Sequence, residues 1–122
     1  MNNGAGDLLD AAAALLGGHR SPGWQRAVAV LTRQAVETAI DDVWRAAAPG
    51  MTAASGRSKL TALPEYADRE VALAAGSLWG ALSNACHVRQ YDLPPTASEL
   101  TEWLVLARSV AAGLPAGVGA TR

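Results

Sequence analysis

Apolar residues recur at helical spacing along most of the chain, and the pattern is clearest between residues 22 and 48. Successive apolar positions there are four, three, four, four and four residues apart, which places them on one face of a helix. These positions are Trp24, Val28, Leu31, Ala35, Ala39 and Val43. Ser21 followed by Pro22 has the character of an N-cap and a first helical residue, and Pro49 with Gly50 ends the pattern. The sequence therefore predicts a helix of about 26 residues, about 39 Å long.

Three further segments show the same spacing. They are residues 7–16, 65–88 and 96–113. The first has Asp7 as a good N-cap and stops at Gly17, and the last starts with a T-x-x-E capping box formed by Thr96 and Glu99. The residues predicted to face inward are Leu8, Leu9, Ala12, Leu15 and Leu16 in the first, Val71, Ala75, Leu78, Leu82 and Ala85 in the second, and Leu100, Trp103, Leu104, Ala107, Val110 and Ala111 in the third.

The connections complete a single helical domain. Residues 51–57 are small and polar and predict an exposed loop, while residues 58–63 allow one short turn before Pro64. The predicted parts are a flexible N-terminus (1–6), a helical bundle domain (7–114) and a disordered C-terminal tail (115–122). The sequence thus predicts an all-α fold, a single antiparallel bundle of four long helices with a possible short fifth helix.

The composition supports an all-helical fold. Twenty-seven residues are Ala, six are aromatic, and Phe is absent. Alanine is the strongest helix former, whereas β-branched and aromatic residues favour strands. Gly76 and Gly80 lie four residues apart inside the predicted helix 65–88. Each glycine there costs about 1 kcal/mol of helix stability relative to alanine. We expect the close approach of another helix, within the fold or across a dimer, to offset that cost.

The charge balance excludes a broadly basic surface. Ten basic and eleven acidic residues give a net charge of −1, which disfavours a generic nucleic-acid binder and leaves only a local basic patch open. A DNA-binding regulator is disfavoured further because no helix is rich in Arg, Asn or Gln. The sequence shows no basic secretory region, no apolar stretch near the about 20 residues of a membrane span, and no cofactor motif. We therefore expect a cytoplasmic protein without a cofactor.

Few residues are suited to metal binding or nucleophilic catalysis. Glu37 and Asp41 lie one helical turn apart and could hold a hard cation, but the Glu-x-x-His pairs of di-metal bundles are missing, so we interpret them as a solvated helix face. Cys86 cannot form an internal disulfide, and its neighbour His87 points about 100° away on a helix. Cys86 is therefore interpreted as a small core residue. His19 lies in a Gly-Gly-His-Arg-Ser-Pro joint and is expected to be exposed.

One segment, SNACHVRQYD, concentrates polar side chains that could carry chemistry. If the helix continues to its end, Asn84, His87 and Tyr91 share one face. His87 is the candidate general acid or base near neutral pH, Arg89 is suited to hold a phosphate, and Tyr91 is suited to donate a hydrogen bond or to stack on a base. The alternative interpretation is structural, with Arg89 capping the helix end while His87 and Tyr91 fill the end of the bundle.

The stretch LSNACHVRQYDLPPTASELTEWL resembles part of the HEPN domains, which are small helical bundles that usually dimerise. Their signature is an Arg, four to six intervening residues and a His near a helix end, often followed by a Tyr and then by a last amphipathic helix. Here His87 matches the motif histidine, Asn84 resembles the polar residue often found within the motif, and Tyr91 resembles the trailing tyrosine. No Arg lies four to six residues before His87. Arg89, or an Arg from a partner chain, would have to substitute.

The resemblance implies a homodimer that binds or cleaves RNA without a metal ion. The setting that it implies is a toxin–antitoxin or phage-defence system, with an antitoxin or another protein as partner. The implied reaction is attack of the RNA 2′-hydroxyl on its own phosphate. His87 would act as base or acid, Arg89 would bind the phosphate, and Asn84 and Tyr91 would orient the substrate. A degenerate relative that binds RNA or protein without cleaving is also compatible with the missing arginine.

The alternative function is that of a non-catalytic protein–protein interaction protein. Gly76, Gly80 and the exposed parts of a Trp-bearing helix face would form its dimer or partner surface. A strictly monomeric chain would count against both hypotheses. Cleavage of RNA would distinguish the first hypothesis from the second.

Overall fold

Helices account for most of the residues described by a computed structural model, which covers residues 4–87 and 93–120, with side chains as far as residue 114. The α-helices are α1 (Ala5–Gly17), α2 (Trp24–Ala47), α3 (Gly56–Ala62), α4 (Arg69–Cys86) and α5 (Ala97–Ala120). Two 3₁₀ helices, η1 (Pro49–Ala53) and η2 (Leu63–Glu65), flank α3. The residues described contain no strand, which confirms the predicted all-α class. None of the helices in these ranges combines the length and apolar character needed to cross a membrane.

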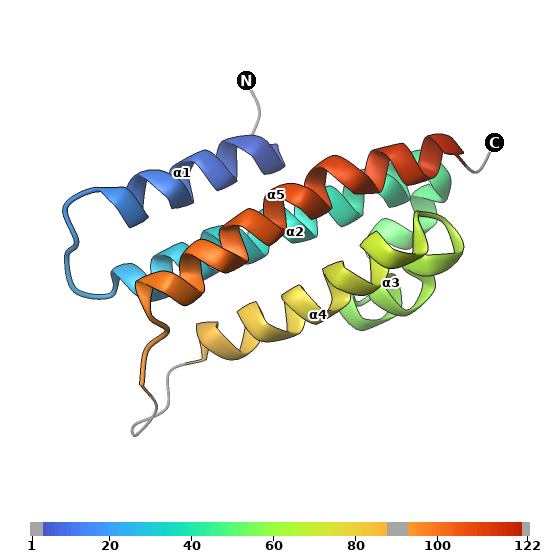
Figure 1. Cartoon of the computed structure of the whole chain (residues 1–122). Helices are drawn as coiled ribbons and strands as arrows, with labels where there is room; N and C mark the ends of the chain where they lie inside the picture. The colour runs from blue at the N-terminus through green and yellow to red at the C-terminus, as the bar shows by residue number, and fades with distance from the viewer. Residues whose placement is uncertain (1–3, 88–92, 121–122) are drawn as a thin grey trace.

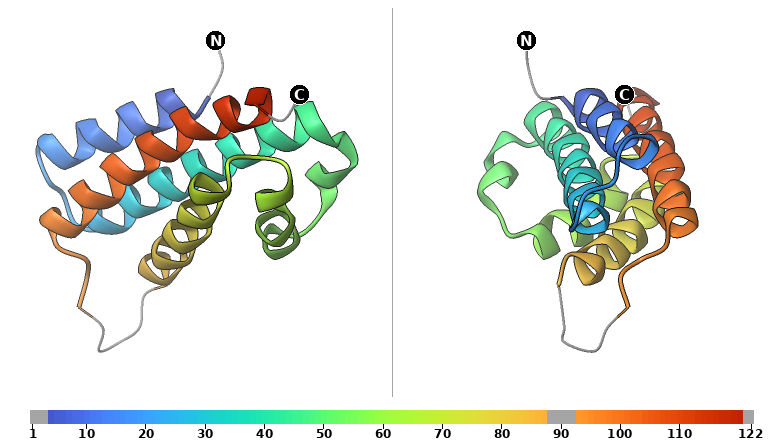
Figure 2. Two further views of the ribbon diagram at one scale, coloured as in Figure 1. Left: turned by 45° about the vertical axis from the view of Figure 1, so that its right-hand side comes forward. Right: turned by 90° about the vertical axis from the view of Figure 1, so that its left-hand side faces the viewer.

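The long helices pack around a central pair. α2 and α5 contact each other, and each of them also contacts α1 and α4. α1 and α4 therefore lie on opposite sides of this pair (Figure 1 and Figure 2). The short helix α3 lies beside the C-terminal part of α2, where it contacts both α2 and α4 (Figure 2).

The core follows the apolar faces that the sequence predicts. Buried positions among those predictions are Leu9, Ala12, Val28, Ala35, Ala39, Val43, Ala75, Leu78, Leu82, Leu100, Leu104, Ala107 and Val110. Trp44 is completely enclosed, and its ring meets Tyr66 edge-on with 4.9 Å between ring centroids. Trp24, Trp79 and Trp103 are partly buried and pack against the core. The tryptophans thus anchor the packing of three different helices.

The predicted capping box at the start of α5 is confirmed. The backbone N–H of Thr96 donates to Glu99 Oε1 at 2.9 Å, and the backbone N–H of Glu99 donates to Thr96 Oγ1 at 3.1 Å. At the start of α4, Asp68 caps the helix by accepting from the backbone N–H of Val71 at 3.0 Å. Both helices therefore begin on side chains that satisfy backbone N–H groups left without an intrahelical partner.

The first two helices begin at other residues than predicted. α1 starts at Ala5 with Gly4 as its N-cap, so Asp7 lies in the first turn, where its charge favours the helix dipole. α2 starts at Trp24 rather than Pro22, because Gly23 at its N-cap has φ 82° and breaks the helical path. Glycine adopts this left-handed conformation without the steric cost of a Cβ.

Ordered turns replace the predicted loop at residues 51–57. The chain leaves α2 through η1 and then enters α3, which covers residues 56–62 and forms the short fifth helix. Ser55 is the N-cap of α3, since its hydroxyl accepts from the backbone N–H of Ser58 at 3.1 Å. Small polar residues indicated a loop here, but the same residues are good helix caps.

The last helix is longer than predicted. α5 reaches Ala120 and so enters the segment 115–122 that we predicted to be a disordered tail, of which residues 121–122 lie outside the described part. Pro115 lies within this helix although proline removes a backbone N–H. Leu114 is completely buried, so the turn that precedes this proline is fixed in the core.

The glycines inside α4 are not sites of close helix approach within the chain. No described atom lies within 4 Å of a Cβ built at Gly76 or Gly80, so the expectation of a close neighbour within the fold was wrong. The close approach occurs instead at Gly113 of α5, where a built Cβ would lie 2.9 Å from Cγ2 of Val71. The α4–α5 contact therefore depends on a glycine at the last position of the predicted helix 96–113.

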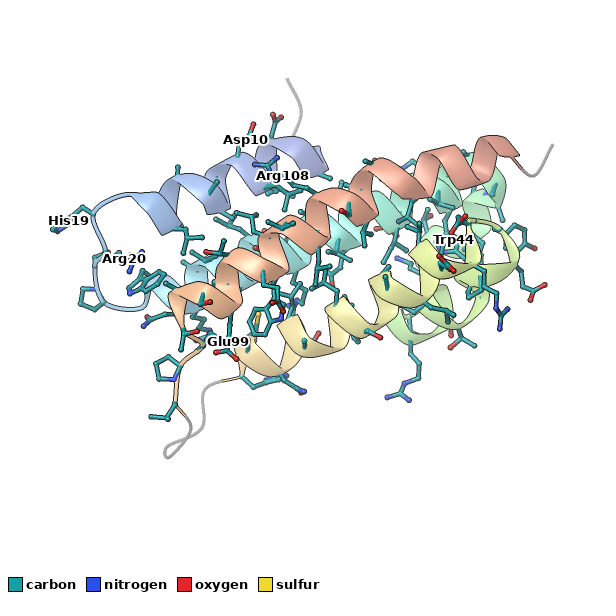
Figure 3. All side chains as sticks on the ribbon, viewed as in Figure 1. Asp10, His19, Arg20, Trp44, Glu99 and Arg108 are labelled. Atoms are coloured by element: carbon teal, nitrogen blue, oxygen red, sulfur yellow. The ribbon has the colours of Figure 1, made fainter. Side chains whose placement is uncertain are left out.

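One ion pair connects the first and last helices. Arg108 of α5 donates from Nη2 to Asp10 Oδ1 of α1 at 2.9 Å (Figure 3). Both side chains are largely exposed, so this pair contributes little free energy. The pair shows which residues of α1 and α5 lie side by side.

Candidate functional site

The structure describes two of the four predicted catalytic residues, Asn84 and His87, whereas Arg89 and Tyr91 lie outside the described residues. Asn84 and His87 are both exposed at the C-terminal end of α4. The helix ends at Cys86, and His87 has extended backbone geometry with φ −89° and ψ 117°. Regular helical geometry therefore ends before His87, and the face that Asn84 and His87 would share with Tyr91 extends outside the described residues.

Cys86 is a core residue, as predicted. It is 6% exposed and lies at the last position of α4, next to the exposed His87. Burial raises the pKa of the Cys86 thiol and outweighs the charges of Arg33 and Arg26, which act in the opposite direction. The thiol is thus protonated at neutral pH, which is unfavourable for a nucleophile.

A second site lies between α2, α3 and α4. It is a cavity of about 250 Å³. Its lining residues are Glu37, Ile40 and Asp41 of α2, Gly56, Lys59 and Leu60 of α3, and Trp79 of α4. The three helices thus bring two carboxylates, one ammonium group and one indole to the same hollow.

Each carboxylate of the cavity is bound by a residue from another helix. Trp79 Nε1 donates to Glu37 Oε2 at 2.9 Å, although the two residues are 42 positions apart. Lys59 Nζ lies 2.8 Å from Asp41 Oδ1, and the lysine side chain is only 15% exposed. Arg33 Nε lies 3.8 Å from Glu37 Oε2, beyond hydrogen-bond distance. Glu37 is therefore bound by a neutral donor and Asp41 by a cation.

These contacts correct the interpretation of Glu37 and Asp41 as a solvated helix face. Both side chains are partly buried, and both bind across helices. Arg33 pairs with Glu37 one helical turn away at 3.8 Å, and Arg45 pairs with Asp42 at 2.8 Å rather than with Asp41. The Asp41 carboxylate is consequently available to Lys59.

Sequence reasoning missed the cavity because no local spacing relates residues 37–41, 56–60 and 79. One signal was present in α2, where Ile40 lies between Glu37 and Asp41 on the same helical face. Ile40 is 3% exposed. A large apolar residue between two acids indicates that their face is covered by another part of the chain.

The described residues offer no metal centre. They contain no group of three or more His, Cys, Asp or Glu side chains that could hold a metal ion. His19 lies in the connection between α1 and α2 and points outward, as expected of an exposed loop residue (Figure 3). The neighbouring Arg20 covers the Trp24 ring at 4.3 Å and donates to the Leu16 carbonyl. This connection is therefore held by its own contacts without a ligand.

Comparison with family models, curated proteins and solved structures finds no match to the chain.

Proposed function

We propose that this chain is a helical interaction module that forms a homodimer through the outer face of α4. This face consists of Leu73, Gly76, Ser77, Gly80 and Asn84, which follow one another at helical spacing on the side of α4 turned away from its buried residues.

The observation that supports the proposal is the absence of charge from an exposed helix. The sequence has no charged residue between Glu70 and His87, which covers nearly all of α4. Leu73 is nevertheless 52% exposed, and Ser77 and Asn84 are exposed as well. The outer face of α4 carries no charge and only the polar side chains of Ser77 and Asn84, whereas a surface helix normally carries charged residues opposite its apolar stripe.

A second copy of the chain is the occupant that fits this face best. Two identical uncharged helices meet without like-charge repulsion, and a two-fold axis lets one surface be its own partner. The open space at Gly76 and Gly80 lets a second backbone approach closely. That approach would offset the cost of two glycines inside a helix.

The interface must also include α5. The uncharged part of α4 is ~24 Å long, so a strip ~10 Å wide covers ~240 Å², well below the ~800 Å² that each partner of a stable dimer buries. Val105 and Leu106 of α5 are 60% and 43% exposed. Leu106 precedes Gly113 by two helical turns, on the side of α5 that contacts α4. These side chains extend the apolar surface beside α4.

We also infer that the four long helices form an antiparallel bundle. In Figure 1, α1 and α4 run back along α2 and α5, and each contacts both helices of that pair. The same arrangement leaves the outer face of α4 at the surface and available for association.

The homodimer is tested by the variant Gly80→Arg. A Cβ at this position has open space within the chain, so the protomer should fold with an unchanged circular dichroism spectrum. The added charge should convert a wild-type dimer to a monomer in sedimentation equilibrium. The matched control is Ala46→Arg on the exposed side of α2, which should remain dimeric. A wild-type chain that stays monomeric at about 1 mM contradicts the proposal.

A second candidate function is the binding or cleavage of RNA, and the exposure of His87 favours it. His87 lies at the end of a helix, as the HEPN resemblance implies for the motif histidine, and its ring is open to a substrate. An exposed imidazole near neutral pH can act as general acid or base.

The RNA hypothesis is tested by incubating total RNA in EDTA with the wild-type chain and with His87→Ala. Cleavage by the wild type that the variant lacks would support a metal-independent ribonuclease. Equal background cleavage by both chains removes the catalytic hypothesis. A gel-shift measurement with the same two chains then decides whether RNA binds without being cleaved.

A further inference from the structure

We propose that residues 49–62 form a lid over the cavity between α2, α3 and α4. The lid comprises η1 and α3, and it opens as one unit while the long helices stay folded. The ion pair between Lys59 and Asp41 is its latch. The lid includes neither the outer face of α4 nor His87, so the inference is independent of the homodimer and of the RNA hypothesis.

The lid contributes no fully buried side chain to the core. Every residue from 49 to 62 is exposed or only partly buried, and Met51 and Leu60 pack against the core from outside. The chain on either side is firmly held, because Trp44 and Leu63 are both completely buried. Segments with few buried apolar contacts are the ones that open locally at low free-energy cost. The lid can therefore move between two fixed ends without unpacking the core.

The side-chain hydrogen bonds within the lid are local. Thr52 Oγ1 donates to the Pro49 carbonyl at 2.8 Å, and Thr61 Oγ1 donates to the Arg57 carbonyl at 2.8 Å. The hydroxyl of Ser55 accepts from a backbone N–H in the first turn of α3 at 3.1 Å. Each of these bonds joins residues three or four positions apart, so each is kept when the lid moves as a body.

One ion pair fastens the lid to α2. Among the described residues, the polar side-chain contact that leads from the lid to a long helix is the one between Lys59 Nζ and Asp41 Oδ1, at 2.8 Å. The two side chains are 15% and 31% exposed, against 58% and 55% for the pair of Arg45 and Asp42 on α2. The attraction in the less exposed pair is less weakened by water and salt. This pair is therefore suited to hold the lid closed.

The packing beneath the lid is incomplete. The cavity of about 250 Å³ has Lys59 and Leu60 of the lid on one side, and Ile40 of α2 and Trp79 of α4 on the other. Side chains that line a cavity lack contact atoms there, which weakens the attachment of the lid. Figure 2 shows the lid as green chain that loops out beside α2 and α4. Its opening would expose Ile40, which is 3% exposed when the lid is closed. The latch thus governs access to the cavity.

Lid opening is tested by labelling a thiol placed beneath it. Ile40→Cys puts a thiol at the cavity, in a Cys86→Ala background that has no other cysteine. Val36→Cys is the matched control, because Val36 is 1% exposed one turn earlier on α2 and does not line the cavity. We expect a maleimide to modify Ile40→Cys at least about tenfold faster than Val36→Cys. Equal rates would overturn the lid, because both thiols would then react only through opening of the whole fold.

The latch is tested by adding Lys59→Met, which keeps an unbranched side chain and removes the charge. Labelling of Ile40→Cys should become about fivefold faster, while labelling of Val36→Cys should not change. About 1 M salt should accelerate labelling when Lys59 is present and have no such effect in Lys59→Met. Arg45→Met is the matched control, since it breaks the pair with Asp42 and leaves the lid untouched. Labelling of Ile40→Cys that ignores Lys59→Met would overturn the latch.

Hydrogen exchange of the wild-type chain tests the lid without any substitution. The backbone N–H groups of α3 should exchange at least about tenfold faster than those in the buried parts of α2 and α4, because α3 opens without them. Exchange of α3 at the same rate as these long helices would show that it unfolds only together with them, and would overturn the lid.

Discussion

At the scale of single residues, two neighbours at the end of α4 have opposite environments. Cys86 is buried and faces the charged side chains of α2, whereas His87 is exposed at the helix C-cap. Their adjacency in the sequence has no chemical meaning, because the helix turns the two side chains apart and then ends. The two residues are therefore considered separately, and the buried Cys86 affects the stability of the fold.

The raised pKa of Cys86 gives the free energy of unfolding a defined pH dependence. Below the ordinary thiol pKa of 9.0, the folded and unfolded chains both keep the proton. As the pH rises through this value, the unfolded thiol ionises while the buried thiol does not, so stability falls until the folded thiol ionises as well.

We predict that wild type loses stability relative to Cys86→Ala above about pH 9, by at most about 1.4 kcal/mol per pH unit. Urea unfolding of both chains at a series of pH values measures this difference, and other titrating groups cancel between them. A difference that stays constant from about pH 7 to about pH 10 would contradict the buried, protonated thiol.

At the scale of elements, the glycines of α4 and α5 should respond to the same substitution with opposite signs. Gly76→Ala and Gly80→Ala have open space for a Cβ within the chain and should each raise the stability of the monomer by about 0.8–1 kcal/mol. Gly113→Ala would place its Cβ 2.9 Å from the stiff side chain of Val71 and should lower stability by about 1–3 kcal/mol. Urea unfolding at concentrations where the chain is monomeric checks both signs. A stabilising Gly113→Ala would show that α4 and α5 are not closely packed there.

The start of α5 offers a matched pair of threonines. Thr96→Ala removes the hydroxyl that accepts from the backbone N–H of Glu99 and should lower stability by about 1 kcal/mol. Thr101 lies inside the same helix, and its hydroxyl only donates to the Ala97 carbonyl. Thr101→Ala should therefore be neutral or slightly stabilising, since alanine is the better helix former. Thermal unfolding distinguishes the two, and equal losses would argue against the capping role of Thr96.

At the scale of the whole molecule, short-range sequence patterns predict the helices but not the contacts between the helices. Helical spacing and the Thr96–Glu99 pair predict most of the helices and one helix start, because both depend on residues a few positions apart. The cavity depends on Glu37, Lys59 and Trp79, which meet only after α2, α3 and α4 have packed. The close contact at Gly113 likewise depends on how α4 and α5 cross, which no local pattern contains.

For the candidate site residues, too, the sequence indicates exposure but not the helical geometry that would bring the side chains together. Asn84 and His87, which belong to the described part of the polar segment, are both on the surface, in agreement with their polar side chains. The shared face expected for Asn84, His87 and Tyr91 required the helix to continue, and it ends at Cys86. Helix ends are the least certain part of any prediction from propensity, because competing caps differ by about 1 kcal/mol.

The ion pair between Asp10 and Arg108 has a consequence for how the chain is made. The two residues are 98 positions apart, and α1 lies against both α2 and α5. While the chain is being synthesised, α1 and α2 can meet early, but the side of α1 that rests on α5 stays uncovered until the last helix has emerged. Leu100, Leu104 and Leu114 reach the core only then. The apolar side chains of α1, α2 and α4 that rest on α5 therefore stay uncovered until α5 has emerged, and exposed apolar surface of this kind is what makes an incompletely folded chain prone to aggregate.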